Sequence, residues 1–149
     1  MDRRHFCAAA LASCAPLTAA APTAGRGRRS YAVADGTYAQ AAEVRQPRRW
    51  LFVSGQVPAD TQGEVPDGFE DQCRLAWRNV GAQLQAAGMG YAHLLKVTVY
   101  LARREDRDAA RTVRQELLGR LPHPPALTVV VAGIYDSAWL LEIEAIAAD

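Results

Sequence analysis

Two segments of the chain have the apolar periodicity of amphipathic helices. In the first, apolar side chains recur at three- and four-residue spacing, which places them on one stripe: Phe69, Cys73, Trp77, Val80 and Leu84. Asp67 or Gly68 can cap the start of this helix, and Gly88 is expected to end it. Because Cys73 falls on the apolar stripe, we expect it to be a buried small hydrophobic residue.

The second helix is predicted to begin with acidic residues. Glu105 and Asp106 suit a first helical turn, where negative charge meets the positive end of the helix dipole. The apolar stripe of this helix then consists of Ala110, Val113 and Leu117. Gly119 and Pro122 are expected to stop it.

Five other segments have the patterns of β-strands, and they cover residues 38–44, 50–53, 95–101, 127–132 and 139–147. From Leu95 onward every second residue is apolar, which predicts a strand with one buried face. Residues 127–132 form an almost continuous apolar run, which predicts a strand buried on both faces. In the last segment, Glu142, Glu144 and Ile146 share one side, opposite the other apolar residues.

The predicted order is two strands, a helix, a strand, a helix and two strands. This order is typical of an α+β domain in which two helices cover one face of a single sheet. The other face carries Glu142 and Glu144 among apolar groups, and burying a carboxylate without a partner is costly. Oligomerisation would bury the apolar groups of this face, and clefts at the subunit contacts would keep the two carboxylates partly solvated.

Composition narrows the class of protein. The 149 residues suffice for one domain, and half of them are hydrophobic, so a substantial core can form. A formal net charge of +1 argues against a nucleic-acid partner, which requires a basic face. His93 and His123 stand alone, without the Cys, Asp or Glu spacing of a metal site.

Residues 1–29 have the features of an export signal followed by a tether, and the domain is expected to cover residues 30–149. Arg3 and Arg4 precede a short alanine-rich stretch, as in a twin-arginine signal, which predicts a periplasmic protein. Residues 19–21 resemble a signal-peptidase site, whereas Cys14 ends a lipobox-like sequence and would carry a lipid that anchors the protein to a membrane. A disordered extension on a cytoplasmic protein remains the alternative.

Three short strings occur in a characteristic order: GTYAQ at residues 36–40, SGQVP at 54–58 and EIEAIA at 142–147. Together they resemble the RidA/YjgF family of small enamine/imine deaminases, and the similarity extends over about residues 31–148. The resemblance implies a chorismate-mutase-like fold. It also implies a homotrimer with a central barrel and small-molecule pockets between the subunits.

The resemblance further implies a chemistry. Family deaminases hydrolyse 2-aminoacrylate-type enamines and their imine tautomers to 2-oxoacids and ammonia, without a metal or an organic cofactor. An arginine binds the substrate carboxylate through paired hydrogen bonds, and a glutamate positions the attacking water. By this resemblance, Glu142 and Tyr38 are the catalytic candidates, and Ser54 and Gly55 line the pocket wall.

The substrate-binding arginine of the family is missing. Its motif reads Pro-Ala-Arg-Ser/Thr, whereas this chain has Leu127 at the arginine position, followed by Thr128. One hypothesis is that Arg111, on the second helix, reaches the pocket and supplies the cation instead. The alternative is that Arg111 belongs to a solvated basic stripe and pairs with Asp108 on the helix surface.

Two functions therefore follow from the sequence. The first is deaminase-type hydrolysis of small reactive enamines or imines. The second is a trimer of the same fold that does not deaminate and that binds a small ligand in the cleft between subunits. Leu127 favours the second, because a substrate carboxylate facing leucine loses its charged partner.

Overall fold

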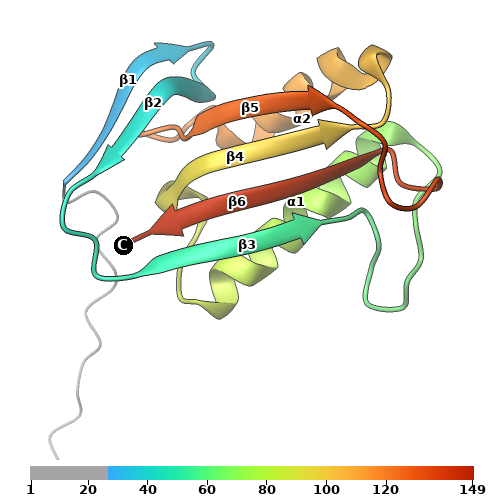
Figure 1. Ribbon diagram of the computed structural model, residues 1–149, viewed down its shortest axis with the longest axis horizontal. Helices are drawn as coiled ribbons and strands as arrows, with labels where there is room; N and C mark the ends of the chain where they lie inside the picture. Colours follow the sequence, from blue (N-terminus) through green and yellow to red (C-terminus); the bar gives the residue numbers. More distant parts are fainter. Residues whose placement is uncertain (1–26) are drawn as a thin grey trace, which may run out of the picture.

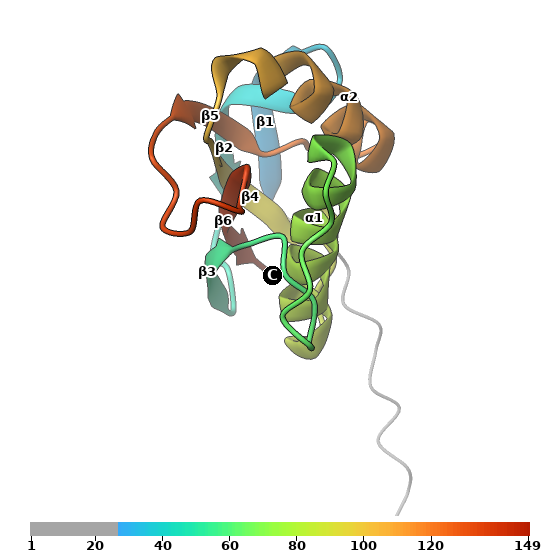
Figure 2. The ribbon, with the colours of Figure 1, turned by 90° about the vertical axis from the view of Figure 1, so that its right-hand side faces the viewer.

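The computed structural model describes residues 27–149, which form one six-stranded sheet with helices on one face. Figure 1 shows the sheet as one layer with both helices behind it, and Figure 2, turned by 90°, shows the helices beside the sheet as the second layer. This arrangement confirms the predicted α+β class, a mixed sheet covered by two helices. The predicted export signal lies outside the described residues, except for the end of its tether.

Residues 27–149 form the following strands and helices. The strands are β1 (Arg28–Ala34), β2 (Tyr38–Val44), β3 (Trp50–Gln56), β4 (Leu94–Leu101), β5 (Ala126–Val131) and β6 (Leu141–Ala148). The helices are α1 (Phe69–Ala86) and α2 (Arg107–Leu118), and short 3₁₀ turns precede β4 (Tyr91–His93) and α2 (Arg104–Asp106). None of the helices in this part of the chain is both long and apolar enough to cross a membrane.

The strand order in the sheet is β1-β2-β5-β4-β6-β3. The β5 strand runs parallel to both β2 and β4, while β6 lies antiparallel between β4 and β3. The parallel pair β4–β5 is connected through α2, as parallel pairs require a crossover. This crossover places α2 over the part of the sheet where the predicted site residues of β2 and β5 lie.

The core lies between the helices and one face of the sheet. The stripe predicted for α1 is buried there, and Trp77 packs edge-on against Tyr91 with ring centroids 5.9 Å apart. From the sheet, β6 contributes Leu141, Ile143 and Ala145 to the same cluster. Glu142 and Glu144 face the other side, as the alternation predicted.

Two predictions about burial were wrong. Leu117, predicted for the apolar stripe of α2, is 38% exposed, and Leu118 is buried in its place. Leu95 is buried as predicted, but an irregularity in the pairing of β4 with β6 leaves it outside the core cluster, to which Leu94 belongs. The β5 strand is not buried on both faces, because Val129, Val130 and Val131 are each at least 36% exposed. In the single chain, this strand therefore leaves apolar surface uncovered.

A strand that the sequence analysis did not anticipate, β1, begins at Arg28, inside the predicted tether. It pairs with β2 as an antiparallel hairpin, whose turn contains Asp35 and Gly36, both with positive φ. An Asp-Gly pair suits such a turn, because glycine has no steric penalty there and aspartate tolerates it better than most residues. The turn carries Asp35 to the edge of the site described below.

Arg28 ties this added strand to the rest of the sheet. Its Nη1 donates to the carbonyl oxygens of His93 (2.8 Å) and Ala148 (3.1 Å), and its Nη2 donates to that of Leu94. Burial lowers the pKa of the Arg28 guanidinium from its ordinary value. The side chain thus links the start of β4 and the end of β6 to β1.

We expect Arg28→Ala to lower the free energy of unfolding by about 1.5–3 kcal/mol, because hydrogen bonds from a charged group are lost in a buried setting. Urea denaturation followed by circular dichroism measures this. Arg29→Ala is the matched control, since Arg29 is exposed. Equal stability of the two variants would contradict the role given to Arg28.

Candidate functional site

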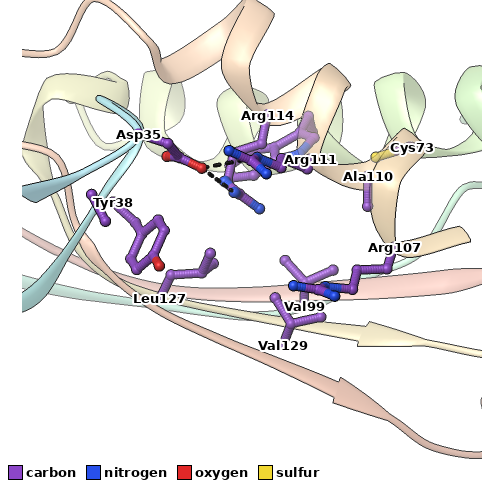
Figure 3. Close-up of a pocket in the computed structure, with 12 residues that line it drawn as sticks. Asp35, Tyr38, Cys73, Val99, Arg107, Ala110, Arg111, Arg114, Leu127 and Val129 are labelled. Carbon is purple, nitrogen blue, oxygen red and sulfur yellow. Dashed lines mark ion pairs between the residues drawn. The ribbon is translucent and has the colours of Figure 1, made fainter. Parts of the chain in front are cut away.

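A cleft of about 520 Å³ opens on the helix side of the sheet (Figure 3). Its volume lies within the range of about 300–1,000 Å³ that is usual for small-molecule sites. The β1–β2 hairpin, α1, α2, β4 and β5 contribute its lining, which consists of Ala34, Asp35, Tyr38, Cys73, Trp77, Val99, Arg107, Ala110, Arg111, Arg114, Leu127 and Val129.

Asp35 is the acidic residue of this cleft. Its Oδ1 accepts hydrogen bonds from the hydroxyl and backbone N–H of Thr37, and its Oδ2 lies 3.0 Å from Nε of Arg111 and 3.7 Å from Nη2 of Arg114. Desolvation opposes ionisation of Asp35, but these hydrogen bonds and guanidinium charges hold its pKa below the ordinary value. Asp35 is therefore an ionised anchor for two arginines.

Of the two arginines that Asp35 binds, Arg114 is the buried one and has a structural role. Its side chain is 7% exposed, its Nε donates to Oγ1 of Thr37 at 3.2 Å, and its guanidinium carbon lies 5.7 Å from the Tyr38 ring centroid. Burial lowers the pKa of Arg114, and the Asp35 carboxylate opposes that shift. Arg114 thereby fixes α2 against the β1–β2 turn and the ring of Tyr38.

Arg111 lies in the cleft and is more accessible, with its side chain 52% exposed. Its ion pair with Asp35 is formed through Nε, and a guanidinium group carries further N–H donors on its other two nitrogens. The expected alternative partner, Asp108, forms no ion pair among residues 27–149. Arg111 is thus held by a residue from the hairpin turn rather than by its own helix.

Leu127 and Tyr38 line the same cleft as Arg111, so the structure brings these three predicted residues together. In Figure 3, the Tyr38 ring and Leu127 lie at the same end of the cleft, below the pair formed by Asp35 and Arg111. The guanidinium of Arg111 enters from α2, across the cleft from the strand position where the family arginine would begin. A cation from α2 can therefore reach the cleft in place of an arginine at position 127 on β5.

Cys73 also lines the cleft, yet it is 1% exposed. Burial raises the pKa of its thiol to about 12. At neutral pH the sulfur stays protonated, and only the thiolate is an effective nucleophile. The expectation of a buried small hydrophobic residue is confirmed by this burial.

The remaining predicted residues belong to the opposite face of the sheet, which we call the open face. Strand pairing places Thr98 beside both Thr128 and Glu144, and Tyr100 beside Glu142. The Lys96 ammonium donates to the Thr128 hydroxyl, and Tyr100 donates to Oε1 of Glu144 at 3.2 Å. The open face is thus partly polar.

Ser54 and Gly55 lie beside these acids. Ser54 lines a shallow pocket of about 290 Å³ on the open face, together with Lys96 and Glu144. A Cβ atom added to Gly55 would lie 1.5 Å from Oε1 of Glu142. Glycine at this position therefore allows the Glu142 carboxylate to pack directly against the backbone of β3.

The predicted site residues consequently form two groups. Tyr38, Leu127 and Arg111 line the helix-side cleft, whereas Ser54, Thr128 and Glu142 lie on the open face. The sheet separates the two groups within one chain. A reaction that uses both groups needs a second copy of the chain.

Sequence reasoning missed Asp35, Arg107, Arg114 and Lys96. The spacing of Arg107, Arg111 and Arg114 was visible in the sequence, but it favours a solvated basic stripe over a binding site. Asp35 sits in a turn that was not recognised as part of a hairpin. Within residues 27–149, no cluster of three His, Cys, Asp or Glu side chains could hold a metal ion.

The chemistry of the cleft suits a small anion. Guanidinium groups bind carboxylates through paired, charge-assisted hydrogen bonds, and the apolar wall formed by Leu127, Val99 and Val129 suits short hydrocarbon groups. Among residues 27–149, the one carboxylate that lines the cleft is that of Asp35, and it is engaged by two arginines.

Comparison with known proteins agrees with this fold. The chain matches the protein family described as endoribonuclease L-PSP over residues 30–149. A RutC family protein of Pyrococcus horikoshii is 37% identical over 75% of the chain and 86% of its own length. The 2-iminobutanoate/2-iminopropanoate deaminase of Mus musculus is 34% identical over 75% of the chain and 81% of its own length.

A solved structure is also similar. The crystal structure of Escherichia coli TdcF with bound serine superposes with a TM-score of 0.64 at 30% identity, covering 80% of this chain and 92% of TdcF. With the fold, the family match and these relatives in agreement, the chain belongs to the RidA/YjgF family.

Proposed function

We propose that the protein hydrolyses small carboxylate-bearing enamines and imines to 2-oxoacids and ammonia, with Arg111 as the carboxylate-binding cation. The observation that carries this proposal is the placement of Arg111 in the cleft with Tyr38 and Leu127. The name of the mouse relative, an iminobutanoate and iminopropanoate deaminase, supports the reaction class. The serine bound to TdcF supports an amino-acid-sized ligand.

We further propose that the active form is a homotrimer. The open face exposes large apolar side chains, with Phe52 72% exposed, Trp50 53% exposed and Val130 36% exposed. Large apolar side chains exposed on one face mark contact surfaces in soluble proteins. Association of copies through this face would cover them. The proposed reaction further requires that the arrangement of copies bring the Glu142 group of one copy to the edge of the Arg111 cleft of another.

In the proposed reaction, Arg111 binds the substrate carboxylate and Leu127 contacts the hydrocarbon group. Glu142 of a second copy accepts a proton from water as the water oxygen bonds to the C=N carbon. Glu142 passes that proton to the nitrogen, which gives a carbinolamine. Transfer of the carbinolamine hydroxyl proton to the nitrogen then forms the C=O bond, breaks the C–N bond and releases ammonia. The balanced outcome is one imine and one water converted to one 2-oxoacid and one ammonia.

The deamination assay tests this proposal. A serine dehydratase generates 2-aminoacrylate in situ, semicarbazide traps the surviving imine, and trapping is compared with and without the full-length protein. We expect the protein to shorten the lifetime of the imine. No acceleration by a protein shown by circular dichroism and sedimentation to be a folded trimer would contradict the proposed reaction.

The second candidate function is ligand binding without deamination, and Leu127 favours it. A leucine at this position makes the cleft wall more apolar than an arginine would. Under this alternative, a 2-oxoacid such as 2-oxobutanoate would bind in calorimetry, while imine lifetime in the trapping assay would remain unchanged. The two measurements together separate the candidates.

A further inference from the structure

The cleft contains more positive charge than a single carboxylate can neutralise. Arg107, Arg111 and Arg114 line it against one carboxylate, Asp35, which leaves two net positive charges. Asp35 pairs with Arg111 and Arg114, whereas Arg107 forms no ion pair within residues 27–149. If Glu142 of a second copy is added, as the proposed trimer requires, one positive charge still remains.

Helix stability does not explain the position of Arg107. It is the first residue of α2, where the helix dipole makes a cation unfavourable. It also lies four residues before Arg111, and like charges at this spacing repel. An anionic ligand in the cleft would relieve both effects.

The two accessible arginines lie at different places along the cleft. In Figure 3, Arg111 lies at the end marked by Asp35 and Tyr38, whereas the Arg107 guanidinium lies beside Val99 and Val129. Four residues, a rise of about 6 Å along the helix axis, separate their positions on α2. The strands β4 and β5 contribute apolar side chains to the same cleft, namely Val99, Leu127 and Val129.

We propose that this cleft selects substrates with two carboxylates, the imines of dicarboxylic amino acids. The inference rests on the proposed function and deepens it. Arg111 binds the carboxylate next to the C=N carbon, and Arg107 binds the distal carboxylate. The methylene groups between them lie on Val99 and Val129. A compact dianion such as phosphate would leave one of the two guanidinium groups without a partner or make no contact with the apolar wall.

Isothermal titration of the full-length protein with two matched five-carbon acids tests this. The acids are 2-oxoglutarate and 2-oxopentanoate, which differ by the distal carboxylate alone. We expect 2-oxoglutarate to bind at least about tenfold more tightly, because a charge-assisted hydrogen bond is added at Arg107. Inorganic phosphate serves as the compact dianion and is expected to bind more weakly than 2-oxoglutarate.

Arg107→Gln is expected to reduce the ratio of the two affinities to about one. Arg104→Gln is the matched control, since Arg104 is exposed, lies one turn earlier and does not line the cleft, so the ratio should persist. A ratio near one in the unmodified protein would overturn the inference, as would tighter binding of phosphate. In either case, deamination of 2-aminoacrylate would still support the proposed function. Failure to bind either acid, together with failure to deaminate, would overturn both.

Discussion

Glu142→Gln is expected to lower the rate of imine hydrolysis by about 10²–10⁴-fold, the range by which general acid–base catalysis contributes. Glutamine keeps the size and hydrogen-bonding capacity of the side chain, but it cannot accept the proton from the attacking water. The semicarbazide-trapping assay measures the rate. Binding of 2-oxobutanoate should change little, because the carboxylate of the ligand is bound by Arg111 rather than by Glu142.

The matched control is Glu144→Gln, on the same strand and the same open face. Glu144 accepts a hydrogen bond from Tyr100 and is not given a catalytic role, so its variant should stay within a few-fold of the unmodified protein. Undiminished hydrolysis by Glu142→Gln would remove this carboxylate from the proposed mechanism. Equal losses in both variants would point to a general effect of charge on the open face.

Gly55→Ala is expected to reduce hydrolysis by about 10²-fold or more without unfolding the protein, because the displaced carboxylate would lose its catalytic contribution. The added methyl group would overlap the Glu142 carboxylate, with its Cβ 2.5 Å from Cδ and 2.9 Å from Cγ. The obstacle is the end of a flexible side chain, so Glu142 can swing away while β3 stays in place. The combined variant with Glu142→Gln should lose little further activity.

Gly90→Ala provides the comparison for this substitution. Gly90 has an extended backbone with φ −147°, and a Cβ added there meets no atom within 4 Å. The activity of the Gly90→Ala variant should match that of the unmodified protein. If Gly55→Ala retained full activity with its melting temperature unchanged, the contact between Gly55 and Glu142 would have no catalytic importance.

The sequence predicted most elements of the fold because their signals are local. The strand at residues 38–44 and the start of α1 at Phe69 were predicted with the bounds that the structure has. Strand β1 was missed because the glycine- and arginine-rich stretch before it was interpreted as a tether. The Asp35-Gly36 pair, flanked by residues of high strand propensity, was the signal that could have revealed the hairpin.

The site could be predicted only in part, for a different reason. Family strings located Tyr38, Leu127 and Glu142, but a linear pattern does not say on which side of a sheet each residue lies once elements pair. The position of Arg111 in the cleft depends on Asp35, which comes from a hairpin 76 residues earlier in the chain. Long-range contacts of this kind leave no periodic signal.

The most direct test of Arg111 as the carboxylate-binding cation is to remove it and to place an arginine at position 127 instead. We expect Arg111→Ala to weaken 2-oxobutanoate binding by about 10–100-fold, the loss of one charge-assisted pair. Adding Leu127→Arg to that variant should restore binding from the β5 strand, with Arg120→Ala, an exposed arginine outside the cleft, as the control. Unchanged affinity in Arg111→Ala, measured by calorimetry on the folded protein, would contradict the assignment of Arg111 as the carboxylate-binding residue.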